Sequence, residues 1–75
     1  MILSDCEVGK SCRVIEIDLS DKTKRRLEIL GMTKNTVVSV LNKKRTGTVI
    51  IKVRGARFAI GRKIANGINV GGEDK

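Results

Sequence analysis

The sequence predicts a small, mainly β domain: a barrel of about five short strands with one α-helix inserted at about residues 21–30. Three observations favour this fold class. Hydrophobic residues make up 40% of the 75-residue chain and are almost all aliphatic, since Phe58 is the single aromatic residue. Aliphatic β-branched side chains pack well in strands. The apolar residues gather in short runs with tight connections, and only one segment has helical spacing. A barrel is expected because closure of the sheet would remove the exposed strand edges.

The first strand follows a short lead-in. Residues 1–10 end in the turn sequence Val8-Gly9-Lys10. Residues 11–18 then alternate apolar and polar side chains, except at the adjacent Val14 and Ile15. This interruption indicates a strand that bends and is covered on both of its faces.

The helix is expected to begin at Ser20 or Asp21, because either side chain can accept hydrogen bonds from the first free backbone N–H groups. Leu27 and Leu30, with Thr23, fall at helical spacings and form one apolar stripe. A helix of about ten residues is too short to be stable alone in water. The stripe is therefore expected to dock against the strands.

The end of the helix is marked by Gly31, which suits a left-handed position because it has no Cβ. Met32 can fold back onto the last turn as the hydrophobic contact that accompanies such a cap. In the connection that follows, Asn35 is of the residue type that best tolerates positive φ after Gly.

The remainder of the chain is expected to form four more strands with short connections. A basic loop at residues 42–47 joins the second and third strands into a hairpin. Gly55-Ala56 forms the next turn, and residues 62–67 form one helical turn with Ile64 and Ala65 pointing inward. The strands are expected at residues 36–41, 48–54, 57–61 and 68–70.

This organisation corresponds to one domain over residues 1–75, with a core of about 3–70 and a frayed tail at 71–75. The N-terminus lacks the basic and apolar regions of a signal peptide, and no stretch approaches the roughly 20 apolar residues that span a bilayer. The sequence thus predicts a soluble, cytoplasmic protein. Cys6 and Cys12 are expected to be reduced thiols.

Charge is distributed unevenly. The net charge is +8, and between Glu28 and Glu73 there are nine basic residues and no acidic one. Such asymmetry indicates either a surface for an anionic partner (nucleic acid, an acidic protein face or the inner leaflet of a membrane) or a basic solvated face without a dedicated partner. Nucleic-acid barrels present aromatic residues for bases to stack on, and Phe58 is expected in the core, so nucleic acid is the less favoured partner. The nine are Lys34, Lys43, Lys44, Arg45, Lys52, Arg54, Arg57, Arg62 and Lys63.

Residues for catalysis or for metal binding are missing. The chain has no His, the commonest general base, and two Cys are too few for a four-ligand zinc site. Gly55, Gly61 and Arg62 depart from a phosphate loop in spacing and in residue type. The sequence therefore predicts a protein that is not an enzyme and that has no cofactor, no metal site and no small-molecule substrate.

Two segments resemble the FeoA family, the small cytosolic proteins of bacterial ferrous iron transport. One is Arg-Leu-Glu-Ile-Leu-Gly-Met at residues 26–32, and the other is the ending Phe-Ala-Ile-Gly-Arg at 58–62 with Ala65 and Ile68-Asn69-Val70. The resemblance covers about residues 3–70. It departs from the family pattern at Asn35, where Gly is usual, at Cys6, which takes an apolar position and is expected in the core, and at the loop 42–47, which lacks a Pro.

The resemblance implies an SH3-like barrel without enzymatic activity that binds or regulates the FeoB membrane Fe²⁺ transporter through its cytoplasmic GTP-binding part. It also implies that iron itself is not bound. The same barrel occurs in metal-dependent transcriptional repressors, so a stand-alone regulatory domain is an alternative, as is a small basic barrel that binds nucleic acid. The oligomeric state is left open.

Candidate residues follow from this hypothesis. The exposed face and end of the helix, with the basic loop, are the expected partner-binding surface: Lys24, Arg25, Glu28, Met32, Lys43, Lys44 and Arg45. A second set is expected to be structural: Leu27, Leu30, Gly31, Gly55, Ala59, Ala65, Ile68 and Val70.

Overall fold

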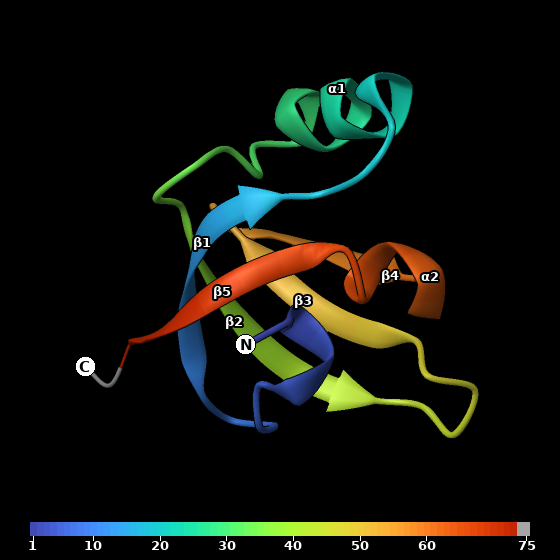
Figure 1. Cartoon of the computed structure of the whole chain (residues 1–75). Helices are drawn as coiled ribbons and strands as arrows, with labels where there is room; N and C mark the ends of the chain where they lie inside the picture. Colours follow the sequence, from blue (N-terminus) through green and yellow to red (C-terminus); the bar gives the residue numbers. More distant parts are fainter. Residues whose placement is uncertain (74–75) are drawn as a thin grey trace.

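One antiparallel sheet of five strands forms the body of the protein, and helix α1 stands at one end of it (Figure 1). The computed structural model describes residues 1–73. Neighbouring strands follow the order β4-β3-β2-β1-β5, so the last strand returns to pair with the first. The elements in chain order are η1 (Leu3–Asp5), β1 (Ser11–Ile17), α1 (Asp21–Ile29), β2 (Val37–Lys43), β3 (Val49–Val53), β4 (Ala56–Ile60), α2 (Arg62–Ala65) and β5 (Ile68–Glu73).

The predicted fold class is confirmed: residues 1–73 are mainly β, with five short strands and one helix inserted after the first. The expected closure of the barrel is not observed, because the strand pairings within residues 1–73 end at β4 on one side and at β5 on the other. Irregular register in β1, between Val14 and Glu16, and in β2, between Val40 and Asn42, interrupts the ladders. Such bulges bend and twist a sheet locally. The result is an open, bent barrel.

The adjacent apolar pair in β1 has two different environments. Val14 is fully buried, whereas Ile15, at the bulge, is 45% exposed. The bend expected there is confirmed, but the expectation that both faces of the strand are covered is wrong at Ile15. Its side chain lies over Gly71 of β5, where an added Cβ would come within 3.3 Å of it.

The core is built from aliphatic side chains of every strand, together with η1 and the two helices. Four of the residues expected to be structural lie in it, namely Leu27, Ala65, Ile68 and Val70. Ala59 does not, because it is exposed on β4. The buried residues are Leu3, Cys6, Cys12, Val14, Ile17, Leu27, Met32, Val38, Val40, Val49, Ile51, Val53, Ile60, Ala65, Ile68 and Val70.

Two hairpin connections position opposite ends of the sheet. Between β3 and β4 the turn residues Arg54 and Gly55 both have positive φ, 50° and 86°, the conformation that favours a tight two-residue hairpin. Between β2 and β3 the loop is tighter than expected, because Lys43 still pairs with Val49. The N–H of Gly47 donates to the carbonyl of Lys44 at 3.0 Å and closes this loop.

The chain end differs from the expected frayed tail. Residues 71–73 belong to β5 and pair with β1, with Gly71 opposite Arg13 and Glu73 opposite Ser11. The other two residues assigned to that tail, 74–75, lie outside the described residues. Strand β5 is therefore longer than the expected strand at residues 68–70.

Candidate functional site

Helix α1 is capped at both ends by the residues that the sequence indicated. The hydroxyl of Ser20 accepts a hydrogen bond from the N–H of Thr23 at 3.3 Å, as an N-cap does. At the other end Gly31 has φ +102° and its N–H donates to the carbonyl of Glu28, while the N–H of Met32 donates to the carbonyl of Leu27. These two bonds make a Schellman motif, which confirms the predicted C-cap.

Two buried side chains hold α1 against the sheet. Leu27 is 4% exposed and Met32 is fully buried, and both belong to the core. Leu30 is different: it is 41% exposed, so its expected place in a buried stripe is wrong. Leu30 is the C-cap residue and its N–H still donates to the carbonyl of Arg26, so it lies about 60° around the helix from Leu27, at the end of the last turn.

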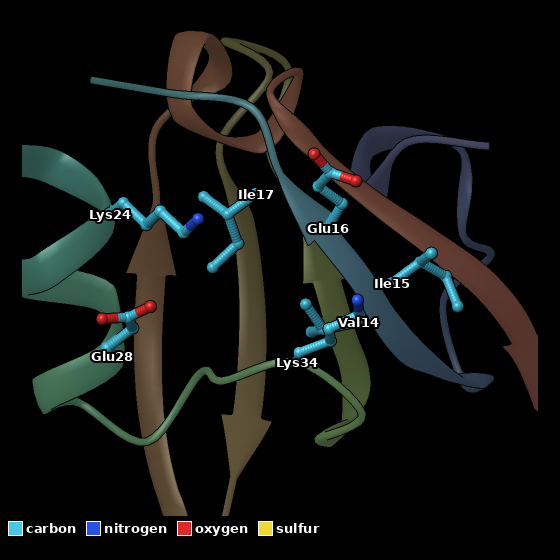
Figure 2. Close-up of a pocket in the computed structure, with 7 residues that line it drawn as sticks. All are labelled: Val14, Ile15, Glu16, Ile17, Lys24, Glu28 and Lys34. Carbon is cyan, nitrogen blue, oxygen red and sulfur yellow. The ribbon is translucent and has the colours of Figure 1, made fainter. Parts of the chain in front are cut away.

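One groove lies between α1 and β1, with a volume of about 340 Å³. Figure 2 shows Lys24 and Glu28 reaching from the helix toward this space. The opposite wall is β1 from Val14 to Ile17, and Lys34 of the connection after α1 also lines the groove, next to Val14 (Figure 2). The groove is therefore lined by charges of both signs together with apolar side chains of β1.

A second, shallower depression of about 380 Å³ lies on the other side of the helix. Ile29 is 79% exposed there, and the residues around it are Asp21, Lys22, Arg25 and Arg26. Ile29 is two positions from Leu27, which is about 200° around a helix of 3.6 residues per turn, so it must point away from the core. An exposed apolar side chain among three cations and Asp21 is thus the main feature of the outer face of α1.

The residues predicted to bind a partner do not form one face. Lys24 and Glu28 line the groove beside β1, whereas Arg25 lies on the outer face. Met32 is buried, so its assignment as a contact residue is wrong; it is a core residue that anchors the cap. Lys43, Lys44 and Arg45 lie at the β2–β3 hairpin, away from α1 (Figure 1).

Ile29 and Leu30 are the residues that sequence reasoning missed as surface candidates. Both are exposed apolar side chains next to the arginines of α1. The spacing already contained a signal, because Leu27 and Ile29 cannot share one helical face. Leu30 carried no comparable signal, because its spacing of three residues from Leu27 favours the same helical face.

The two thiols are buried and are not joined by a disulfide. Burial raises the pKa of the Cys12 thiol to about 12, and the hydrogen bond and charge of Cys6 act in the same direction. A protonated, buried thiol is a poor nucleophile and a poor metal ligand. Cys6 is a core residue, as expected. Among residues 1–73 no three His, Cys, Asp or Glu side chains are grouped so that they can hold a metal ion.

Comparison with known proteins connects this architecture to one family. The model of the FeoA domain matches residues 1–71. No protein of curated function matches the chain. None of the helices within residues 1–73 has the length and apolar character to cross a membrane.

Solved structures agree with the family match. An iron uptake regulatory protein (FeoA) is 31% identical with a TM-score of 0.82, over 93% of this chain and 92% of that one. The zinc complex of Stenotrophomonas maltophilia FeoA, described as a prokaryotic SH3 domain protein that possibly activates ferrous iron transport, is 30% identical with a TM-score of 0.81, over 95% and 89%. A Chlorobium tepidum FeoA protein is 27% identical with a TM-score of 0.86, over 93% and 68%. A manganese-dependent transcriptional repressor, 21% identical with a TM-score of 0.87 over 97% of this chain and 41% of that one, shares the fold.

Proposed function

This chain belongs to the FeoA family of ferrous iron transport, and from that premise we propose that it is a non-enzymatic accessory protein of the FeoB transporter. It acts in the cytoplasm by binding the GTP-binding part of the transporter. The sequence resemblance, the SH3-like fold and the lack of catalytic groups support this function. The contact surface is the outer face of α1.

The main support for this proposal is the exposure of Ile29 on the outer face of α1. Its side chain is 79% exposed, although removing such a group from water is favourable by about 1.5–3 kcal/mol. Arg25 and Arg26 flank it, and apolar side chains with neighbouring arginines are typical of the centres of protein interfaces. The partner therefore offers an apolar pocket with acidic residues around its rim.

The caps of α1 and two buried side chains set the position of this face. Leu27 and Met32 fix the helix from below, and the hydroxyl of Thr36 donates to the carbonyl of Gly31 at 3.2 Å to hold the connection to β2. A surface that is already ordered loses less conformational entropy on binding. The arginines and Ile29 are thus presented without a folding step.

The proposal is tested by pulldown of the cytoplasmic region of the FeoB transporter with the whole protein and two variants. Ile29→Ala is expected to weaken binding about tenfold, as truncation of a central contact does, and Arg25→Glu is expected to weaken it further at low salt. The matched control is Arg57→Glu, a charge reversal of the same kind at an exposed position of β4. Circular dichroism checks that each variant is folded.

Three binding results would contradict the proposal. If Ile29→Ala and Arg25→Glu bind as tightly as the unchanged protein, α1 is not the contact surface. If Arg57→Glu weakens binding as much as Arg25→Glu does, the interaction depends on net charge alone. If the folded, unchanged protein does not bind, the proposed partner is wrong.

A further inference from the structure

The end of the molecule that carries the β2–β3 hairpin is strongly basic. Within the described chain, five cationic side chains come from two segments that are about twenty residues apart: Lys43, Lys44 and Arg45 at the hairpin, and Arg62 and Lys63 at the start of α2. We call this surface the basic end. The function proposed above does not use it.

Side-chain contacts bring the two segments together. Lys43, Lys44 and Arg62 line one cleft of about 250 Å³, which Gly47 and Asp5 also border. The aliphatic stem of Arg62 lies against Gly47, where an added Cβ would come within 2.7 Å of the Arg62 Cδ. The hairpin loop and α2 thus form one surface, in which Asp5 is the one acidic side chain that borders the cleft.

Two of the five cations pack or hydrogen-bond within the fold, and the other three extend into solvent. The ammonium group of Lys43 donates to the backbone carbonyl of Ser4 at 2.7 Å, and Arg62 packs on the loop. Lys44, Arg45 and Lys63 are exposed. Cations brought together on one exposed surface repel each other weakly, and an anionic partner removes that repulsion.

We propose that the basic end docks the protein on an anionic membrane surface, through the phosphate and carboxylate groups of lipid head groups. Clusters of Lys and Arg are attracted to such a surface without needing a shaped pocket. A strand of nucleic acid is the less suitable partner, because bases need aromatic platforms and the chain has only Phe58, which packs against the core. The choice of a membrane rests on the proposed function, which places the protein beside a membrane transporter.

The arrangement has a consequence for orientation. Helix α1 lies at one end of the molecule, and the β2–β3 hairpin extends from the opposite side (Figure 1). A protein held to the membrane by the basic end therefore keeps Ile29 and Arg25 free. Membrane docking and partner binding use different surfaces and can occur together.

Vesicle co-sedimentation tests this inference with the whole protein and without any transporter. The vesicles contain phosphatidylcholine alone or with about one third phosphatidylserine. Lys44→Gln with Arg45→Gln removes two exposed charges of the basic end. The matched control, Lys52→Gln with Arg57→Gln, removes two charges near the β3–β4 turn, at the other end of β3.

The unchanged protein is expected to bind the anionic vesicles only, and less as salt rises. Each Lys or Arg near the surface contributes about a fivefold change in partitioning, so Lys44→Gln with Arg45→Gln should bind roughly 25-fold more weakly. The control should bind like the unchanged protein. Thermal unfolding followed by circular dichroism confirms that both variants are folded.

Four results with vesicles would overturn the inference: no binding to anionic vesicles, equal loss in the two variants, equal binding to neutral vesicles, or release by millimolar inorganic phosphate. Release by phosphate would indicate a site for a single free phosphate. Tighter retention of a DNA duplex than of the vesicles at the same salt would assign the basic end to nucleic acid. Because the assay contains no transporter, its failure leaves the proposed binding through α1 standing.

Discussion

Leu27 is the side chain that decides whether α1 stays attached to the sheet, and its replacement by Ala is the sharpest test of how the helix docks. Leu27 is 4% exposed and packs in the core with the fully buried Met32. Leu30, three residues later, is 41% exposed. The two leucines have the same side chain and nearly the same position, so they form a matched pair that differs mainly in burial.

The expected magnitude follows from that difference. Leu27→Ala removes three buried carbons, at about 0.8 kcal/mol each, and leaves a cavity, so the free energy of unfolding should fall by about 2–5 kcal/mol. Leu30→Ala removes carbons that already contact water and should cost less than about 1 kcal/mol. A domain of this length is stable by only roughly 4–11 kcal/mol. Leu27→Ala therefore removes a large fraction of the total.

The assay is thermal and urea unfolding followed by far-ultraviolet circular dichroism, because the chain has no Trp or Tyr to report by fluorescence. At roughly 4–8 °C per kcal/mol for a domain of this size, Leu27→Ala should lower Tm by about 10 °C or more. Leu30→Ala should lower it by only a few degrees. Equal losses in the two variants, or a larger loss for Leu30→Ala, would refute the description of how α1 is anchored.

Two further predictions concern backbone conformation and pH. Gly31→Ala should lower the free energy of unfolding by about 1–2 kcal/mol, because φ at this position is +102° and an added Cβ would lie 3.1 Å from the Arg54 Cδ. In urea unfolding, Gly31→Asn should be intermediate in stability between the unchanged protein and Gly31→Ala, since Asn tolerates positive φ. A Gly31→Ala variant as stable as the unchanged protein would contradict backbone strain at this position. Cys12 has a pKa of about 12 against 9.0 for a free thiol, so the unfolded chain loses its thiol proton first and the free energy of unfolding should fall as pH rises from about 9 toward 12, by at most about 1.4 kcal/mol per pH unit. Cys12→Ala should lack that component of the decline in unfolding curves measured across this range, and identical slopes for both proteins would count against the raised pKa.

Local features of the fold, namely helix caps, turns and strands, could be predicted from the sequence. Ser20 was one of two candidates for the N-cap, and Gly31 and Asn35 were assigned to a cap and a turn; the N-cap hydrogen bond is at Ser20 and the positive φ values are at Gly31 and Asn35. The strands were also located, because short alternating runs of β-branched residues are typical of half-buried strands. These features depend on neighbours within a few residues.

Other features depend on contacts between distant parts of the chain, and there the sequence was insufficient. Leu30 is exposed although its spacing from Leu27 favours the buried face, and Gly71 lies in β5 because it pairs with Arg13 of β1. The partner face was predicted as one set, but the fold separates Arg25 from Glu28 and places Lys44 at the hairpin. The exposure of Ile29, by contrast, follows from helical spacing and could have been predicted from the sequence alone.

Isothermal titration calorimetry of the whole protein with the cytoplasmic region of the FeoB transporter of the same organism would show whether α1 is the binding surface. We expect saturable binding that Ile29→Ala weakens about tenfold and that Lys44→Gln with Arg45→Gln leaves unchanged, because those residues are not on α1. Absence of binding by the folded protein, or binding that depends on Lys44 and Arg45 but not on Ile29, would contradict it.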